Sequence, residues 1–278
     1  MTKKVWLVTG CSTGFGKEFV CQLAKKGDFV ICTVRKAEQV AALEAIDPQL
    51  VTGVVLDVQN QASIDAAKAH IGKKFGRIDV LVNNAGYGSM GAIEEVTEEE
   101  IFRQFDVNVF GAIRMIKLVL PYMRNQRSGH ILNITSIAGL NGFPGVGIYN
   151  GSKFALEGIG EALAGEVRHL GIKVTNVEPG PFKTEWAGPS ATFGTRSIAD
   201  YANSAYKNMD DIANRHGHQP GDPVKAVKAM IDLTELEYPP VHLPLGYLAY
   251  KRVNIRLTEF KEELDKYEYL GKPTDFDR

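Results

Sequence analysis

A tyrosine and a lysine four residues apart can carry acid–base chemistry in this chain of 278 residues. Tyr149 and Lys153 belong to the run Tyr-Asn-Gly-Ser-Lys, which we expect to open a helix. Side chains at this spacing share one helix face, about 6 Å apart. A free phenol has a pKa of about 10, and a cation one turn away should lower that pKa. Tyr149 could then give a proton to an alkoxide or take one from an alcohol.

Two further polar residues support this pair, which by itself is common by chance. Ser136 follows a strand predicted at 130–134, at the sheet edge where parallel sheets bind ligands, and can hold a substrate oxygen while Tyr149 protonates it. Asn108 interrupts the apolar face of a helix predicted at 101–123, and a buried asparagine needs hydrogen-bond partners. The candidate catalytic residues are therefore Asn108, Ser136, Tyr149 and Lys153.

A glycine-rich turn after the first predicted strand, at 5–8, has the character of a phosphate site. It reads Thr-Gly-Cys-Ser-Thr-Gly-Phe-Gly over residues 9–16, and a helix is predicted to follow. Such a turn presents backbone N–H groups and a helix N-terminus to an anion, and glycine lets the backbone approach a pyrophosphate closely. The spacing Gly-x3-Gly-x-Gly differs from the usual dinucleotide fingerprint, so a purely structural turn stays open as an alternative.

The end of the second predicted strand, at 29–34, bears on the choice of cofactor. Folds that prefer NAD place an acidic residue there for the ribose hydroxyl, whereas folds that prefer NADP place a basic one near the 2′-phosphate. Here Arg35 and Lys36 follow the strand and no acidic residue does. The guanidinium of Arg35 suits a phosphate. We therefore predict NADP (NADPH), with NAD the less favoured cofactor.

Together these motifs resemble the short-chain dehydrogenase/reductase (SDR) family. The resemblance rests on Gly10, Gly14 and Gly16, on Asn-Asn-Ala-Gly at 83–86, on the four candidate catalytic residues, and on Pro179-Gly180. It covers residues 5 to 185 strongly. It implies a carbonyl/alcohol oxidoreductase that uses a nicotinamide cofactor bound by Gly10, Ser12, Thr13, Gly14, Phe15, Gly16, Arg35, Lys36, Asp57, Val58, Asn84, Ala85, Gly86, Tyr149, Lys153, Pro179, Gly180, Phe182 and Thr184.

The resemblance also implies roles for single residues. Lys153 would lower the pKa of Tyr149 and bind the nicotinamide ribose, and Asn108 would hold a water that leads to this lysine. Asp57 would bind the adenine amino group, with Val58 packed on the ring. Phe182 and Thr184 would fix the nicotinamide carboxamide, and Asn84 would contact the ribose region.

The elements that must position these residues alternate along the chain. Apolar, β-branched runs at 5–8, 29–34, 51–56, 78–82, 130–134, 172–177 and 241–243 read as buried parallel strands. Amphipathic helices are predicted between them at 15–26, 101–123 and 154–170. This alternation predicts an α/β fold: a Rossmann-type, doubly wound parallel sheet of about seven strands, with helices on both faces, in a single domain over 1–278.

Two segments lie outside this alternation. Residues 181–223 are rich in glycine, proline and aromatics, with a short helix predicted at 197–215, and are expected to form a substrate lid. Residues 246–278 are predicted to be a C-terminal helical extension. Residues near the predicted site are mostly apolar or aromatic, which favours a hydrophobic ketone, aldehyde or alcohol, and the candidate substrate-binding residues are Ser136, Tyr149, Asn141, Phe143 and Trp186.

Composition excludes several function classes. The net charge is −1, so nothing favours nucleic acid, and no apolar stretch is long enough to span a membrane. Three cysteines argue against a disulfide framework, and no leader is recognisable, so a cytoplasmic location is expected. We predict no metal site. The resemblance implies a homodimer or homotetramer paired through the helices at 101–123 and 154–170.

Two rival functions remain. An epimerase or dehydratase of the same superfamily also carries Tyr-x3-Lys, but it usually has another glycine spacing and a larger C-terminal domain. A non-catalytic, NADP-sensing binding protein would keep the fold but tends to lose the tyrosine or the lysine. With NADPH as cofactor, reduction of a ketone or aldehyde is the expected direction.

Overall fold

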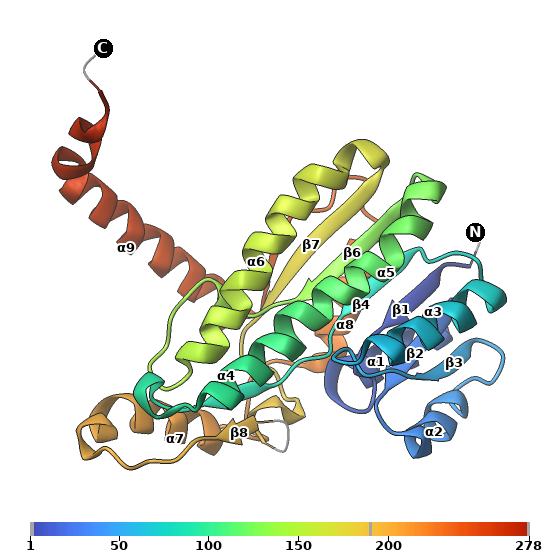
Figure 1. Cartoon of the computed structure of the whole chain (residues 1–278), viewed down its shortest axis with the longest axis horizontal. Helices are drawn as coiled ribbons and strands as arrows, with labels where there is room; N and C mark the ends of the chain where they lie inside the picture. The colour runs from blue at the N-terminus through green and yellow to red at the C-terminus, as the bar shows by residue number, and fades with distance from the viewer. Residues whose placement is uncertain (1–2, 189–190, 277–278) are drawn as a thin grey trace.

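A parallel sheet of seven strands forms the centre of the computed structural model, which describes residues 3–188 and 191–276 (Figure 1). The strand order is β3-β2-β1-β4-β6-β7-β9, and every pairing is parallel. The predicted doubly wound sheet is therefore confirmed. Its strands are β1 Val5–Val8, β2 Phe29–Val34, β3 Val51–Val55, β4 Val80–Asn83, β6 Gly129–Ile134, β7 Ile172–Pro179 and β9 His242–Leu245.

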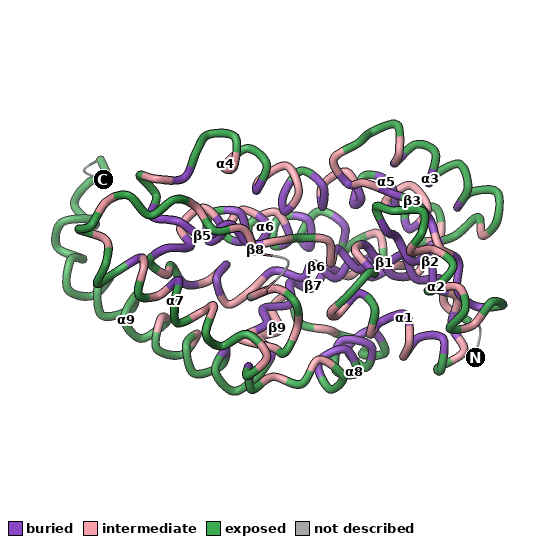
Figure 2. The backbone as a smooth tube through the Cα atoms, turned by 90° about the horizontal axis from the view of Figure 1, so that it is seen from below, coloured by how far each residue is buried: buried purple, intermediate pink, exposed green. Residues whose placement is uncertain are grey.

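Helices cover both faces of this sheet. Apolar residues of α1 (Gly14–Lys26) and α8 (Pro223–Leu233) fill one face, whereas α3 (Gln61–Lys74), α5 (Gly111–Gln126) and α6 (Gly147–Val167) fill the other. The short α2 (Val40–Glu44) packs beside β3. Figure 2 shows the central strands of the sheet as buried. No described helix is both long and apolar enough to cross a membrane.

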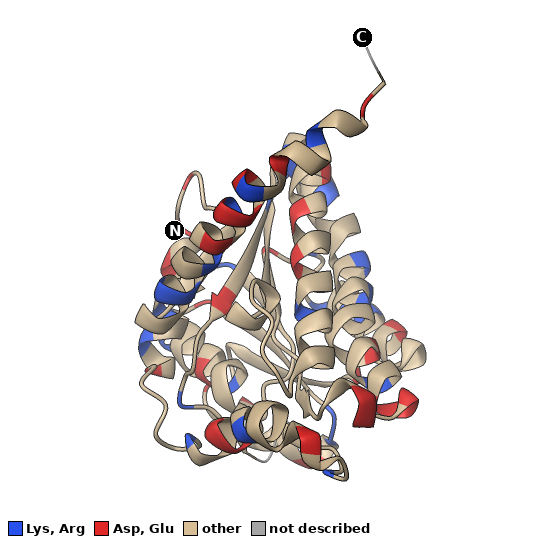
Figure 3. Ribbon diagram, turned by 90° about the vertical axis from the view of Figure 1, so that its left-hand side faces the viewer, with Lys and Arg blue, Asp and Glu red and all other residues tan. Residues whose placement is uncertain are grey.

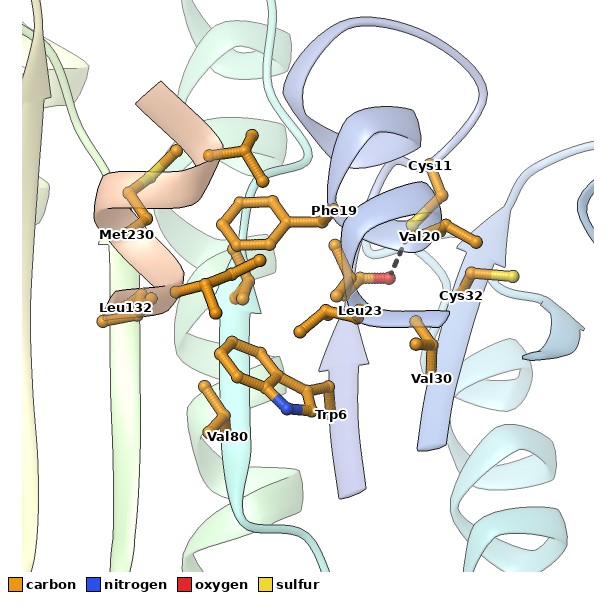
Figure 4. Close-up of a cluster of buried hydrophobic side chains, with 14 of the residues drawn as sticks. Trp6, Cys11, Phe19, Val20, Leu23, Val30, Cys32, Val80, Leu132 and Met230 are labelled. Carbon is orange, nitrogen blue, oxygen red and sulfur yellow. Dashed lines mark hydrogen bonds between the residues drawn. The ribbon is translucent and has the colours of Figure 1, made fainter. Parts of the chain in front are cut away.

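Trp6 anchors β1 under α1 and α8 (Figure 4). Its ring is fully buried 6.3 Å from that of Phe19, and its indole N–H donates to Asp28 at 3.1 Å. A buried tryptophan N–H needs such a partner. Cys11 is also fully buried, with its thiol on the carbonyl of Val8, so it acts as a small apolar filler beneath the glycine turn. The core thus fixes where β1 ends and α1 begins.

The helix predicted at 101–123 is divided by a π-helical turn. Helix α4 (Glu98–Phe105) begins with a capping box between Thr97 and Glu100, and the π turn Asp106–Phe110 then joins it to α5. Such turns insert one residue into a helix and recur at functional sites. Apolar periodicity cannot reveal a single inserted residue, so the sequence predicts one uninterrupted helix here.

The predicted boundaries change most around α6 and in the segment after β7. Helix α6 begins at Gly147, two residues before the expected opening at Tyr149 and ahead of the amphipathic stretch predicted at 154–170, so Tyr149 lies in its first turn. Residues 197–215 contain one α-helix, α7 (Lys207–Asn214), preceded by 3-10 and π turns. A second parallel pair, β5 (Gly88–Met90) with β8 (Ala191–Phe193), has no counterpart among the predicted strands because both are short and lack a β-branched run.

The last helix, α9 (Tyr247–Gly271), leaves the body of the molecule (Figure 1). Its first turn is anchored by Ala249, which is fully buried next to Gly180. All residues from 257 to 276 are exposed. The distal part of this helix therefore has no packing partner within the described chain.

Two buried carboxyl groups connect α6 to the sheet edge formed by β7 and β9. Glu178 is fully buried, and its Oε1 lies 2.9 Å from Nδ1 of His242, which also lies 3.5 Å from Glu157. Asn176 donates to Glu157 at 2.7 Å, and the exposed Glu161 lies 3.3 Å from Nε2 of the histidine. Burial raises the pKa of both buried carboxyls, that of Glu178 to about 9. Glu178 is therefore neutral at pH 7.

This raised pKa makes the stability of the fold pH-dependent. Because the folded-state pKa of Glu178 lies above its ordinary value of 4.5, its contribution is complete below about pH 4.5 and is lost as the pH rises through 9. The variant Glu178→Gln keeps a neutral side chain and should lose this dependence. We expect the free energy of unfolding of the variant, measured with urea, to rise by about 2–5 kcal/mol relative to that of the wild type between pH 5.5 and pH 9. Glu161→Gln is the exposed control, and parallel pH profiles for wild type and Glu178→Gln would contradict the assignment.

Candidate active site

The four candidate catalytic residues come from three elements and meet at the carboxyl edge of the sheet. Tyr149 and Lys153 lie on the first two turns of α6, Ser136 follows β6, and Asn108 lies in the π turn before α5. Lys153 donates to the carbonyl of Ile134 at 2.8 Å, and its Nζ lies 5.8 Å from the centroid of the Tyr149 ring. Both side chains are less than a tenth exposed. The pair is thus held in a largely dry environment.

The π turn directs the Asn108 side chain toward the segment that follows β4. Its Nδ2 donates to the carbonyl of Tyr87 at 3.0 Å and to Ser152 at 3.1 Å, while its Oδ1 accepts the N–H of Tyr87 at 3.1 Å. A Cβ placed on Gly86 would lie 3.1 Å from this Oδ1 and 3.7 Å from Nζ of Lys153. Asn108 and Lys153 therefore approach the same glycine, and its missing side chain leaves room between them.

The pKa of Tyr149 moves opposite to the sequence-based prediction. Burial raises the pKa of Tyr149 to about 12, and the Ser136 side chain only partly offsets this. Burial lowers the pKa of Lys153 to about 8, against the opposing charge of Glu157 one turn further along α6. The predicted lowering of the Tyr149 pKa is not found in this structure, where desolvation of the buried phenol is the largest cause of the shift. Tyr149 is a neutral phenol here, which is the form that can donate a proton.

The ends of β1 and β4 clamp the glycine turn between them. The Asn84 side chain donates to the carbonyls of Thr9 and Gly10 at 2.8 and 3.0 Å, and the Thr9 hydroxyl accepts the N–H groups of Asn84 and Ala85. Gly10 has a φ of 69°, and a Cβ on Gly16 would lie 2.2 Å from the Gly10 carbonyl oxygen. The turn therefore requires glycine at both positions. It lies at the point where the strand order reverses, which is the ligand-binding point of such sheets.

The N-terminus of α1 fits the phosphates of a dinucleotide. The cap residue Thr13 makes no side-chain hydrogen bond to the first turn, no acidic residue lies in that turn, and Ser12 and Thr13 are exposed. These N–H groups and the helix dipole favour an anion. The loop after β7 closes this region: the Phe182 ring packs 5.4 Å from that of Phe15. Pro179 and Gly180 lead into this loop, and a Cβ on Gly14 would lie 3.6 Å from Thr184.

The predicted cofactor residues after β2 are exposed, whereas those after β3 are partly or mostly buried. Arg35 and Lys36 are exposed, and Arg35 makes no ion pair with the described residues, whereas Lys36 lies 3.7 Å from Glu38. Asp57 accepts the N–H of Gln59 at 3.0 Å. The Val58 side chain is mostly buried against Gly111 of α5, so its contact with an adenine ring stays a prediction.

The candidate substrate residues lie around Tyr149. The Trp186 ring packs 4.9 Å from that of Tyr149, in an apolar cluster that also holds Met90, Val146 and Met209. Trp186 comes from the segment after β7 and Met90 from β5, so the small β5–β8 sheet joins that segment to the site. Phe143 is half-buried beneath Arg252 of α9, at 5.7 Å.

Asn150 positions the loop that follows Ser136, a role that the sequence analysis missed. Its side chain donates to the carbonyls of Ala138 and Asn141, both at 2.8 Å, and accepts the N–H of Phe143 at 3.0 Å. Asn141 itself is buried and contributes its backbone to this network. The sequence holds one signal for this role: an asparagine stands next to Tyr149 on a helix expected to be buried. A buried amide must be hydrogen-bonded.

Comparisons with known proteins agree with this geometry. The pattern of the short chain dehydrogenase family matches residues 4–193. A 3-ketodihydrosphingosine reductase of Bacteroides thetaiotaomicron is 39% identical over 250 residues, which cover 89% of this chain and 90% of that protein. A short-chain dehydrogenase from Streptomyces avermitilis superposes with a TM-score of 0.93 at 38% identity, over 99% of both chains. ElxO with NADP bound superposes with a TM-score of 0.73 at 29% identity, over 89% of this chain and 100% of ElxO.

The hydrogen bonds of Asn108 predict a stability effect. Replacing Asn108 by Ala leaves the N–H of Tyr87 without its partner, while the Tyr87 carbonyl keeps the hydrogen bond from Gln104, and we expect a loss of about 1–3 kcal/mol in the free energy of unfolding, measured with urea. Ser152→Ala, which removes only one partner of Asn108, should cost less. If Asn108→Ala were as stable as wild type, another group would have to hold Tyr87 in place.

Proposed function

Because the chain belongs to the short-chain dehydrogenase family and is an oxidoreductase, we propose that it is an NADP(H)-dependent reductase of hydrophobic ketones or aldehydes. One observation carries this proposal: a buried, neutral Tyr149 lies beside Ser136 and Lys153 at the ligand-binding edge of the sheet. A neutral phenol in this position suits proton donation to a carbonyl oxygen that becomes an alkoxide.

In the proposed reaction, Ser136 holds the carbonyl oxygen and Tyr149 donates its proton to that oxygen. The nicotinamide cofactor supplies the hydride. Lys153, whose pKa of about 8 lies near neutrality, stabilises the phenolate that Tyr149 leaves behind and can return a proton to it. Asn108 and Lys153 both approach Gly86, which supports Asn108 as the next group of a proton relay.

The preference for NADP(H) rests on the basic end of β2. Arg35 and Lys36 are exposed there, and a guanidinium without an ion pair to the described residues suits a 2′-phosphate. ElxO, at 29% identity, holds NADP. The glycine turn, Asn84 and the loop from Pro179 to Thr184 supply the remaining proposed contacts to the dinucleotide.

The apolar surroundings of Tyr149 support a bulky, hydrophobic substrate. Met90, Trp186 and Met209 pack around the tyrosine, and few charged groups accompany them. The Bacteroides relative bears the name of a reductase that acts on the ketone of a long-chain base, a substrate of this character. Residues 181–223 are the proposed lid, because Trp186 of that segment contacts the Tyr149 ring.

Assembly into a homodimer or homotetramer is also proposed, through the continuous segment of α4, the π turn and α5 together with α6. Outward-facing aromatic residues on this side of the molecule support it: Phe102 is 71% exposed, and Phe110 and Phe154 are nearly half exposed. Exposed apolar groups gathered on one side of a monomer are typical of protein interfaces.

Removal of the phenolic hydroxyl tests the proposed chemistry. Tyr149→Phe should lower kcat by about 10²–10⁴-fold or more, because the proton donor is lost. NADPH binding, followed by its fluorescence, should persist. Turnover is measured as loss of NADPH absorbance with a panel of aliphatic, aromatic and polycyclic ketones and aldehydes. Tyr238→Phe, at a residue 85% exposed, is the control. Near-normal turnover of Tyr149→Phe would contradict the proposed role of Tyr149 as the proton donor.

Substitution of Arg35 tests the cofactor preference. Arg35→Ser should weaken NADPH binding by about 10–100-fold, the loss expected for a charge-assisted contact to phosphate, and leave NADH binding unchanged. Isothermal titration with both cofactors measures the difference. Arg124→Ser, at an exposed arginine near the end of α5, is the matched control. An equal loss of affinity for NADPH and NADH would contradict the proposed contact between Arg35 and the 2′-phosphate.

A further inference from the structure

From Leu257 onward, helix α9 carries an apolar stripe that nothing in the described chain covers. Its first turns touch the body through Ala249 and Arg252, but every residue from 257 onward to 276 is exposed (Figures 1 and 2). Isolated helices are marginally stable in water, and most helical stability in proteins comes from packing one face. A helix of this length therefore needs a partner for its apolar face.

The apolar residues of α9 have the spacing of a coiled-coil seam. They alternate in steps of three and four residues, which keeps a stripe facing one partner helix. Leu257 and Leu264 are 61% and 54% exposed, and Phe260 and Tyr267 nearly half. The complete seam is Tyr250, Val253, Leu257, Phe260, Leu264 and Tyr267.

The charges beside this seam distinguish between possible partners. Lys251, Arg252 and Arg256 make the first part of α9 basic, whereas residues 259–268 contain five acidic and two basic side chains (Figure 3). One half of the helix is therefore complementary to the other. The acidic half also disfavours an anionic lipid surface.

The residues that flank the seam favour one orientation of two identical helices. Arg256 and Glu263 lie on one side of the seam, with Lys261 and Glu268 on the other. In a parallel pair, Arg256 would face the partner's Lys261 and Glu263 the partner's Glu268, which are like charges. In an antiparallel pair, Arg256 faces the partner's Glu263, twice by symmetry. Lys261 already pairs with Asp265 and Glu268 with Lys272, whereas Arg256 and Glu263 make no ion pair with described residues.

We propose that α9 forms an antiparallel coiled coil with α9 of a second copy of this chain. The seam then closes in layers that place Tyr250 against the partner's Tyr267, Val253 against the partner's Leu264, and Leu257 against the partner's Phe260. A two-fold axis passes between residues 258 and 259, as an interface between identical surfaces requires. This contact is separate from the one proposed through α5 and α6, and it does not depend on the proposed reaction.

A seam substitution tests the assembly. Leu257→Glu places a charge in a central layer, whereas Thr258→Glu adds the same charge beside the seam. Size-exclusion chromatography with light scattering should give Leu257→Glu half the molar mass of the wild type at equal concentration, with Thr258→Glu unchanged. Circular dichroism and cofactor binding check that the body of each variant is folded. An unchanged mass for Leu257→Glu overturns the proposal.

Cysteine crosslinking tests the orientation. Residues 250 and 267 are about 26 Å apart along one helix, so in an antiparallel pair neither position faces its own copy. In a Cys21→Ser background, where Cys11 and Cys32 are buried, a short bismaleimide should crosslink chains carrying both Tyr250→Cys and Tyr267→Cys, and neither single variant. Crosslinking of a single variant would show a parallel pair. Sedimentation of wild type with phosphatidylglycerol vesicles, without any mass change in Leu257→Glu, would assign the seam to lipid and overturn the proposal.

Discussion

The hydrogen bond from Lys153 to the carbonyl of Ile134 ties α6 to the sheet, and the arrangement of the candidate site depends on it. A buried ammonium must keep hydrogen-bond partners, and this one takes the last carbonyl of β6. Because Ser136 follows two residues later, the same bond sets its position relative to Tyr149. Glu157 then places a carboxyl one turn beyond the lysine, so a single face of α6 carries a phenol, a cation and an acid in sequence.

Burial removes these side chains from water, and this desolvation shifts their pKa values. Desolvation favours the neutral forms of Tyr149, Lys153 and Glu178, as the directions of their pKa shifts show. Burial therefore keeps Tyr149 protonated and separates its pKa from that of Lys153. The sheet edge beyond them is rigid: Asn84 and Thr9 tie β1 to β4, and Asn150 ties α6 to the loop after Ser136.

Local sequence rules predict the sheet and the glycine turn because each depends on contiguous residues. Seven apolar runs predict seven strands, and Gly10, Gly14 and Gly16 are needed where a turn is tight. Other features depend on contacts between distant residues. The π turn at Asn108 is an insertion of one residue, the β5–β8 pair joins residues about a hundred apart, and the pKa of Tyr149 follows from total burial, not from its distance to Lys153 along the helix.

Helix α9 is the element whose apolar face the single chain leaves exposed. Its periodicity predicts a helix equally well whether that helix packs on its own domain or on another copy. Only the structure separates these cases, because it shows that Ala249 is buried while Leu257 and Leu264 are not. Since Arg252 of this helix lies over Phe143, the base of α9 also borders the loop that follows Ser136.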